Sequence, residues 1–291
     1  MRKLVIVGVG LIGGSFALAL RAAGAVTEVV GVDRDTAALA EAVRLGVIDR
    51  AAGDEGDAYA GADLVMLAVP VGQMPAVLAA MAPHLKAGTL VSDAGSTKQD
   101  VIAAARAALG AKLGQFIPGH PIAGAEKSGV AAASADLYRG KRVVLTPLPE
   151  NSRADIDRLA DAWRACAAEV DELPATTHDQ TFAAVSHLPH LLAFNLVHEL
   201  AGRADSERLF GFAAGGFKDF TRIASSDPEM WRDICVANRA PLIAEVDAFL
   251  AQLLRTRVLL AAADAEALQR LFSAARTARD TWLEAMEPPG E

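Results

Sequence analysis

The run Gly8-Val9-Gly10-Leu11-Ile12-Gly13 is the feature of this sequence that most restricts the fold of the chain. Its spacing, GxGxxG, is weak evidence alone but becomes specific when a strand precedes it and a helix follows. Here the apolar segment Lys3–Val7 is typical of a buried strand, and Leu11–Ala23 of a helix. Asp33 ends the next predicted strand, Glu28–Asp33, about 20 residues after the glycines. The start of the chain is therefore predicted to be a strand–helix–strand unit that binds a dinucleotide.

Each position of the glycine run has its own physical reason. Gly8 allows a tight turn, Gly10 lets the backbone approach a pyrophosphate, and Gly13 lets the helix pack closely on the strand. The helix start, with Leu11 and Ile12, offers unpaired N–H groups and the positive end of the helix dipole to the phosphates. These residues are the expected phosphate site.

Asp33 bears on the choice of dinucleotide. Its carboxylate would accept hydrogen bonds from a ribose diol and would repel a 2′-phosphate, which favours NAD over NADP. The adjacent Arg34 keeps NADP open, because an arginine at this place can hold a 2′-phosphate.

Apolar strands alternate with helices through the first half of the chain. The predicted helices after the glycine run are Thr36–Leu45, Val77–Met81, Gln99–Leu109 and Arg153–Ala167. The predicted strands are Asp63–Val69, Thr89–Ser92, Gln115–Ile117, Arg142–Thr146 and Glu169–Leu173. Val69 and Pro70, where one strand ends, are assigned to the cofactor site. This alternation predicts an α/β domain with a Rossmann-type, doubly wound parallel sheet covered on both faces.

After Pro174 the pattern becomes helical to the end of the chain. Helical periodicity covers Asp179–Leu200, Asp205–Phe212, Pro228–Leu254 and Ala261–Glu284. Thr177 and Gln180 have the spacing of a capping box, and Pro189 should kink the first of these helices. We therefore predict a dinucleotide-binding domain over residues 1–174 and an all-helical domain over residues 175–291.

Charge and cysteine content narrow the classes of partner. The net charge of −8 gives no general attraction for nucleic acid, so an anionic ligand must meet a local group of Lys and Arg. Two cysteines suggest neither a disulfide framework nor a metal pattern, and a reducing cytoplasm is expected.

The basic, apolar N-terminus resembles a secretory signal, but the glycine spacing favours a strand, a turn and a helix there. No other stretch is apolar for long enough to span a membrane.

The stretch GHPIAGAEKSGV, residues 119–130, carries the clearest candidate catalytic group. Its glycines stand at P-loop spacing, but Ala125 and Glu126 intervene where a P-loop needs lysine. His120 is the candidate general base, because an unperturbed imidazole titrates near neutral pH. Pro121 should hold His120 in an extended conformation. Gly119 and Gly124 would let the backbone pass close to cofactor and substrate.

The other histidines have ordinary explanations. His84, His178 and His198 are interpreted as surface or helix-packing residues. His187 and His190 stand three apart on a predicted helix and could share a metal, but no third ligand has a suitable spacing, so no metal is expected.

Four motifs together resemble the prephenate/arogenate dehydrogenase family. They are GHPIAGAEKSGV, DAGSTK at 93–98, SHLPH at 186–190 and GGFKDFTRIASSDPEMWRDI at 215–234. The resemblance runs from the glycine fingerprint to about Arg239. It implies a helical domain that forms a homodimer, and NAD-dependent oxidative decarboxylation of prephenate to 4-hydroxyphenylpyruvate, or of arogenate to tyrosine, in tyrosine biosynthesis.

The resemblance also implies roles for individual residues. His120 would take the proton of the ring hydroxyl, and Ser96 would orient His120 and touch the nicotinamide. Arg222 would hold a substrate carboxylate, and His190, rather than His187, would be a second substrate-binding histidine. Three further residues complete this set: Glu126 and Lys218 as a charged pair that controls access, and Trp231 as an apolar wall.

Some alternatives stay open at this point. Ser96 also opens a helix-start pattern and is a candidate N-cap. A 3-hydroxyacid dehydrogenase would use a lysine such as Lys218, and a catalytically inactive NAD-binding sensor would need neither His120 nor Ser96. The residues do not decide between prephenate and arogenate, nor whether tyrosine inhibits.

Overall fold

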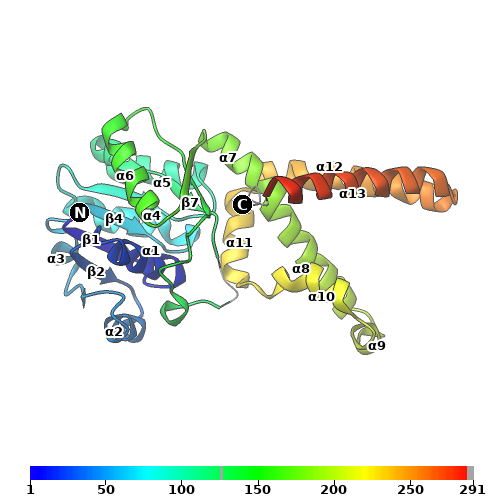
Figure 1. Ribbon diagram of the computed structural model, residues 1–291, viewed down its shortest axis with the longest axis horizontal. Coiled ribbons are helices and arrows are strands. Elements are labelled where there is room, and N and C mark those ends of the chain that lie inside the picture. Colours follow the sequence, from blue (N-terminus) through cyan, green and yellow to red (C-terminus); the bar gives the residue numbers. More distant parts are fainter. Residues whose placement is uncertain (125–126, 287–291) are drawn as a thin grey trace. The chain divides into compact units, whose positions relative to one another are not determined.

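The computed structural model describes residues 1–124 and 127–286 (Figure 1). The chain divides into two compact units, Met1–Leu242 and Ile243–Glu291. The domain boundary expected at residue 174 falls inside the first unit, so that division stays a prediction.

A six-stranded sheet, parallel throughout, forms the centre of the first unit. Its order is β3-β2-β1-β4-β5-β6, and the strands are β1 (Lys3–Val7), β2 (Glu28–Val32), β3 (Arg50–Ala51), β4 (Leu64–Leu67), β5 (Leu90–Asp93) and β6 (Phe116–Ile117). This is the strand order of a dinucleotide-binding sheet, and it confirms the predicted Rossmann-type fold. The order reverses between β1 and β4, and ligands of such sheets bind beyond the carboxyl ends of the strands at that point.

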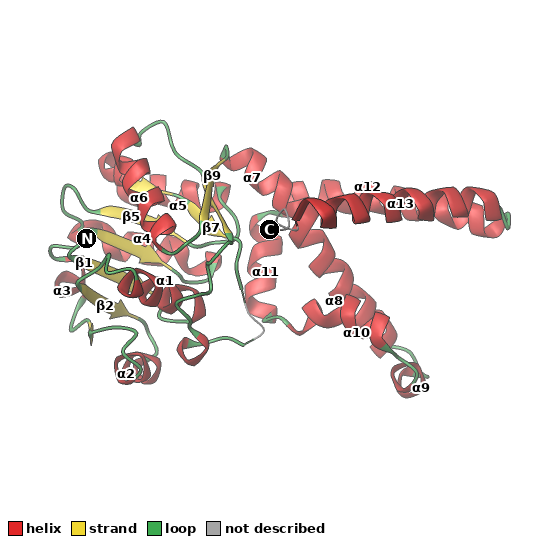
Figure 2. Cartoon of the chain, viewed as in Figure 1, coloured by secondary structure: helices red, strands yellow, loops and turns green. Residues whose placement is uncertain are grey.

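Helices cover both faces of this sheet (Figure 2). They are α1 (Leu11–Ala22), α2 (Thr36–Arg44), α3 (Glu55–Tyr59), α4 (Met74–Met81), α5 (Gln99–Leu109) and α6 (Arg153–Ala165). Alternate strand residues divide between two cores: Leu4 and Ile6 pack with α1 and α6, whereas Val5 and Val7 pack with α4 and α5. Strands buried on both faces explain the continuous apolar runs in the sequence.

A second sheet, which the sequence pattern did not separate from the first, carries the histidine motif. It joins β7 (Gly119–Pro121), β8 (Arg142–Leu145) and β9 (Glu169–Glu172) in that order. β7 pairs antiparallel with β8, and His120 lies opposite Val144. His120 is therefore held in an extended strand, as predicted from Pro121.

The chain after Pro174 is helical, as predicted, but its helices break at different places. The elements of the first unit are α7 (Ala175–Phe182), a π-helical turn (Ala183–His187), α8 (Leu188–Ala201), α9 (Ser206–Gly211), α10 (Gly215–Thr221) and α11 (Pro228–Ala237). The π-helical turn lies just before Pro189, where a kink was expected. The capping box at Thr177 and Gln180 is wrong, because α7 begins at Ala175. The single helix predicted over Pro228–Leu254 is also wrong, because Asn238 ends α11.

The second unit consists of most of α12 (Arg239–Ala261) and all of α13 (Ala265–Met286), joined by a three-residue turn. Large apolar side chains remain exposed on both helices. They are Ile243, Leu250, Leu253, Leu254, Val258 and Leu260 on α12, and Phe272, Trp282, Leu283 and Met286 on α13. Many exposed apolar side chains on neighbouring stretches of chain are typical of a surface that another molecule covers.

Candidate active site

The glycine run forms a tight turn at the carboxyl end of β1. Gly8 has a φ of +92°, and a Cβ there would lie 2.5 Å from the carbonyl oxygen of Ala68. A Cβ on Gly13 would lie 2.5 Å from the oxygen of Gly8. A Cβ on Gly10 would meet no protein atom within 4 Å, so the loop leaves the side above Gly10 clear. These contacts match the separate demands that a dinucleotide places on the three glycines.

Asp33 lies beside this loop and is oriented by it. Its Oδ2 accepts a hydrogen bond from the backbone N–H of Val9 at 2.9 Å, and its Oδ1 accepts one from the N–H of Asp35 at 3.0 Å. Val69 and Pro70 follow β4, the strand next to β1, and so lie at the point where the strand order reverses. A glycine turn, an acidic residue and this strand end make a cradle that fits a dinucleotide with a free ribose diol.

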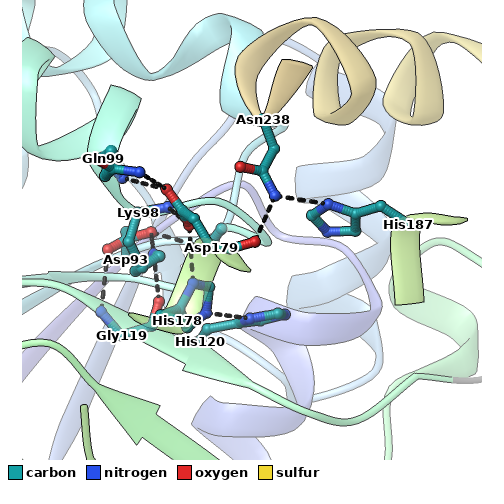
Figure 3. A network of polar contacts seen from close by, with 10 residues as sticks. Asp93, Lys98, Gln99, Gly119, His120, His178, Asp179, His187 and Asn238 are labelled. Carbon is teal, nitrogen blue, oxygen red and sulfur yellow. Dashed lines mark hydrogen bonds and ion pairs between the residues drawn. The ribbon is translucent and has the colours of Figure 1, made fainter. Parts of the chain in front are cut away.

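A chain of polar contacts surrounds His120 (Figure 3). His120 Nδ1 lies 2.8 Å from Nε2 of His178, and Nδ1 of His178 lies 2.9 Å from Oδ1 of Asp179. The phenyl ring of Phe182 packs on both imidazoles. His178 has no exposed surface, so its interpretation as a surface histidine is wrong, and its contact with His120 goes beyond the helix packing that was the alternative.

Asp179 joins α7 to the start of α5. Its carboxylate accepts hydrogen bonds from the backbone N–H groups of Lys98 at 2.8 Å and Gln99 at 2.9 Å. These are unpaired donors of the first turn of α5, which an N-cap normally satisfies. The suggestion that Ser96 is this N-cap is therefore wrong, because the cap comes from a residue about 80 positions later.

A buried ion pair holds the residue before His120. Lys98 and Asp93 have no exposed side-chain surface and form an ion pair. Asp93 accepts a hydrogen bond from the N–H of Gly119 at 3.1 Å, and Lys98 donates one to the carbonyl oxygen of Gly119 at 2.6 Å. A Cβ on Gly119 would lie 3.0 Å from the backbone oxygen of Asp93, so glycine permits this approach. The close contact expected of Gly119 is thus with β5.

The surroundings of these groups set their charge. Burial, followed by the neighbouring His178, Lys98 and His187, holds the pKa of His120 well below 6.5. Burial also lowers the pKa of His178, although its hydrogen bond to Asp179 opposes this. Burial by itself would raise the pKa of Asp179, but hydrogen bonds from His178 and from the backbone outweigh it and the pKa is lowered. At neutral pH both imidazoles are neutral and Asp179 is a carboxylate, so His120 can act as a base.

A second group of aromatic and basic residues lies on α8, on α11 and on the turns that adjoin α8 and α10. The imidazole of His190 stacks on Trp231 with ring centroids 3.6 Å apart. The turn Arg222–Ser225 packs against α8, the helix that carries His190. Burial lowers the pKa of His190, the hydrogen bond to Ser186 opposes this, and the positive charge of Arg222 lowers the pKa further. His187 is buried, and its Nδ1 accepts a hydrogen bond from Asn238 at 3.0 Å. Of the two histidines, His190 is the more accessible to a ligand.

The contacts predicted for Glu126, Lys218 and Ser96 are not seen among the described residues. Glu126 lies outside the described residues, so its pairing with Lys218 is not seen, and Lys218 itself is exposed on α10. Ser96 is half-buried, and no hydrogen bond joins it to His120 in residues 1–124 and 127–286. Sequence reasoning missed His178, Asp179 and Lys98; the adjacent His-Asp pair was the only local signal for the first two.

The described part of the chain holds neither a cluster of metal ligands nor a membrane-spanning helix. Within it, no group of three or more His, Cys, Asp or Glu side chains is placed to hold a metal ion. None of the helices described there combines the length and the apolar character needed to cross a membrane.

Two family models match this chain. One, described as the nucleotide-binding domain of prephenate dehydrogenase, matches residues 16–172. The other, described as the dimerization domain of prephenate dehydrogenase, matches residues 174–274.

Individual relatives extend over nearly the whole chain. Prephenate dehydrogenase of Bacillus subtilis is 36% identical, over 95% of this chain and 75% of the relative. Cyclohexadienyl dehydrogenase of Zymomonas mobilis is 35% identical, over 96% of this chain and 95% of the relative. Among solved structures, prephenate dehydrogenase from A. aeolicus in complex with hydroxyphenyl propionate and NAD+ is 35% identical with a TM-score of 0.88, covering 98% of both chains.

Proposed function

The chain belongs to the prephenate dehydrogenase family, and from that membership we propose that it catalyses the NAD-dependent oxidative decarboxylation of prephenate to 4-hydroxyphenylpyruvate in tyrosine biosynthesis. Arogenate, which would give tyrosine, is the second candidate substrate. The observation that carries the proposal is the position of His120. Its imidazole is neutral, and the strand that holds it belongs to the same unit as the dinucleotide cradle. Membership in this family sets aside the 3-hydroxyacid dehydrogenase reading.

The reaction needs a base, an orienting site and a hydride acceptor. His120 Nε2 takes the proton of the C4 hydroxyl, the C4 hydride is transferred, and loss of the C1 carboxylate as CO2 leaves an aromatic ring. NAD, when bound by Gly8, Gly10, Gly13 and Asp33, supplies the hydride acceptor. The proton held by His120 returns to the phenolic oxygen or to solvent. Aromatisation makes the step strongly downhill, so the protein's task is alignment, proton removal and exclusion of water.

Arg222, His190 and Trp231 are the proposed substrate contacts. Prephenate carries two carboxylates, and the planar guanidinium of an arginine meets a carboxylate with two parallel hydrogen bonds. The packing of the turn that begins with Arg222 against α8, and the stacking of His190 on Trp231, support a shared subsite. We keep Glu126 and Lys218 as a proposed access pair, and Ser96 as a proposed contact on the nicotinamide side.

Arg222→Ala is expected to raise KM for prephenate while kcat falls much less. Loss of a charge-assisted hydrogen bond costs about 1.5–3 kcal/mol, which corresponds to an increase of KM of about 10–100-fold. Steady-state kinetics at saturating NAD measure this. Arg158→Ala, on α6, removes an exposed arginine paired with Asp155 and is the matched control. If KM and kcat are both unchanged in Arg222→Ala, the assignment of the carboxylate contact is wrong.

The pH dependence of kcat/KM follows from the pKa of His120. A protonated imidazole cannot accept the hydroxyl proton, so activity is lost as pH falls through that pKa. Because the pKa lies well below 6.5, kcat/KM is expected to stay level from about pH 8 down to 6.5 and to decline only below it. An acid limb in kcat/KM centred at or above 6.5 would contradict this.

Quaternary structure and location follow from the same membership. We propose a homodimer through the helical domain, supported by the dimerization-domain match and the exposed apolar side chains of α12 and α13. We keep the domain division at residue 174, which the two family-model matches, 16–172 and 174–274, support. A cytoplasmic location is proposed from the biosynthetic role.

A substrate panel tests the proposed function. Prephenate, arogenate and a set of 3-hydroxy acids are each offered with NAD and with NADP, and reduced cofactor is followed by absorbance. Rapid reduction of NAD with prephenate or arogenate, and none with 3-hydroxy acids, is expected. Turnover of 3-hydroxy acids alone, or of nothing, would overturn the proposal.

A further inference from the structure

The mechanism above uses His120 but not the contacts that join it to His178 and Asp179. This contact chain runs from a carboxylate through one imidazole to a second, with separations of 2.9 Å and 2.8 Å between the heavy atoms. Asp179 is itself fixed by the N–H groups of Lys98 and Gln99. Both imidazole rings pack against Phe182, with ring centroids 4.8 Å and 4.5 Å from it. Every member of the chain is therefore held in place by a second contact.

The donors and acceptors of this chain determine where the protons lie. The Asp179 carboxylate only accepts hydrogen bonds, so the proton of His178 must be on Nδ1. Neutral His178 then has a lone pair on Nε2 and acts as the acceptor there. His120 must in turn donate from its Nδ1. Its other ring nitrogen, Nε2, therefore carries the lone pair, and no residue in 1–124 or 127–286 makes a hydrogen bond to it.

We propose that His178 and Asp179 are positioning residues that fix the tautomer and the ring orientation of His120, so that Nε2 is the basic atom presented to the substrate hydroxyl. This inference rests on the role of His120 in the proposed function. Asp179 sets His178, and His178 sets His120, so a carboxylate controls the base through an intervening imidazole. The usual arrangement has the carboxylate in direct contact with the catalytic histidine.

The same chain stabilises the charge that develops during the reaction. When Nε2 of His120 takes the hydroxyl proton, the ring becomes an imidazolium that still donates from Nδ1 to His178. The Asp179 carboxylate lies beyond that ring and offsets the new positive charge. During this step no proton passes from His120 to His178 or from His178 to Asp179. This contribution offsets the burial that otherwise disfavours a charged His120.

A pair of variants with similar shape separates a positioning role from a packing role. Glutamine and methionine are both unbranched and of similar length. His178→Gln keeps an amide oxygen that can accept from Nδ1 of His120, whereas His178→Met provides packing without a strong acceptor. Asp179 is unsuitable as the first target because it also caps α5.

Two readouts on the purified full-length protein test the proposal. In His178→Met, kcat should fall by about 10²-fold or more, because a wrongly set imidazole tautomer costs up to about 10⁴-fold in serine proteases. In His178→Gln, kcat should stay within about tenfold of wild type. KM for NAD should change little in either variant. Equal loss of kcat in the two variants would overturn the positioning role, even if both remain folded by circular dichroism.

Imidazole nitrogen shifts give a readout that does not depend on turnover. The chain has six histidines, so ¹⁵N-histidine labelling with single substitutions allows their assignment. Wild type and His178→Gln should show His120 protonated on Nδ1, and His178→Met should lose that preference. A His120 protonated on Nε2 in wild type would refute the inference. If wild type turns over neither prephenate nor arogenate, the proposed function fails while the tautomer measurement still decides this one.

Discussion

His120→Asn is expected to lower kcat for prephenate by about 10²–10⁴-fold, the usual contribution of a positioned acid–base group. Asparagine has no atom that can take the hydroxyl proton at neutral pH, so the chemical step loses its base. Its amide can still donate to Nε2 of His178, which keeps the Asp179–His178 contact intact. The fold and the binding of NAD should therefore be preserved. Stopped-flow measurement of NADH formation in a single turnover isolates the step that is affected.

The matched control for this variant is His84→Asn. His84 packs against Tyr59, with ring centroids 6.3 Å apart, and belongs to no part of the contact chain around His120. Its substitution should leave kcat unchanged. Normal turnover in His120→Asn would remove His120 from the mechanism and with it the proposal for His178.

Lys98→Met is expected to destabilise the protein by about 3–5 kcal/mol, since it leaves the Asp93 carboxylate buried without its partner. Lys98 and Asp93 are wholly buried, and both are bonded to the backbone of Gly119. The strand that carries His120 should therefore loosen, and kcat should fall along with stability. Urea unfolding followed by fluorescence measures the change in the free energy of unfolding.

Two further variants show whether the uncompensated charge is the cause. Asp93→Asn in the Lys98→Met background removes that charge and should restore part of the stability. Arg142→Met breaks an exposed ion pair with Asp171 and should change stability little. If Lys98→Met unfolds at the same urea concentration as wild type, the buried pair does not hold the strand.

Short-range patterns in the sequence predicted the glycine turn between β1 and α1. A side chain at Gly8 would clash with the backbone of Ala68, and a side chain at Gly13 would clash with the backbone of Gly8. Both Ala68 and Gly8 directly follow strands that are neighbours in the sheet. The spacing of glycines, helix and acidic residue is fixed by local geometry, so one sequence reveals it. The six-stranded sheet follows from the same local alternation of apolar strands and helices.

The contact chain around His120 could not be predicted in this way. His178 meets His120 only because α7 packs beside β7, and at a sequence separation of 58 residues there is no local sign of that contact. The expected cap at Ser96 failed for the same reason, since Asp179 supplies it from another helix. β7 itself is a three-residue strand of glycine, histidine and proline, and it is ordered by its pairing with β8 and by the hydrogen bonds of Asp93 and Lys98 to Gly119.

The break at Asn238 has a similar cause. Helical periodicity continues through Pro228–Leu254, so the sequence predicted one helix. The side chain of Asn238 instead donates to the backbone oxygen of Asp179 at 2.8 Å and to His187 at 3.0 Å. These hydrogen bonds to distant residues lie where α11 ends, and the hydrophobic periodicity of the sequence cannot predict them.

The coupling of hydride transfer to decarboxylation is the central claim, and one stoichiometric measurement tests it most directly. The purified protein is given prephenate and NAD, and NADH, CO2 and the aromatic product are quantified together. Equal amounts of NADH, CO2 and 4-hydroxyphenylpyruvate are predicted, because each hydride and proton lost from C4 gives a ring ketone that becomes aromatic by losing one CO2. NADH formed without CO2, or no NADH with either prephenate or arogenate, would contradict the account.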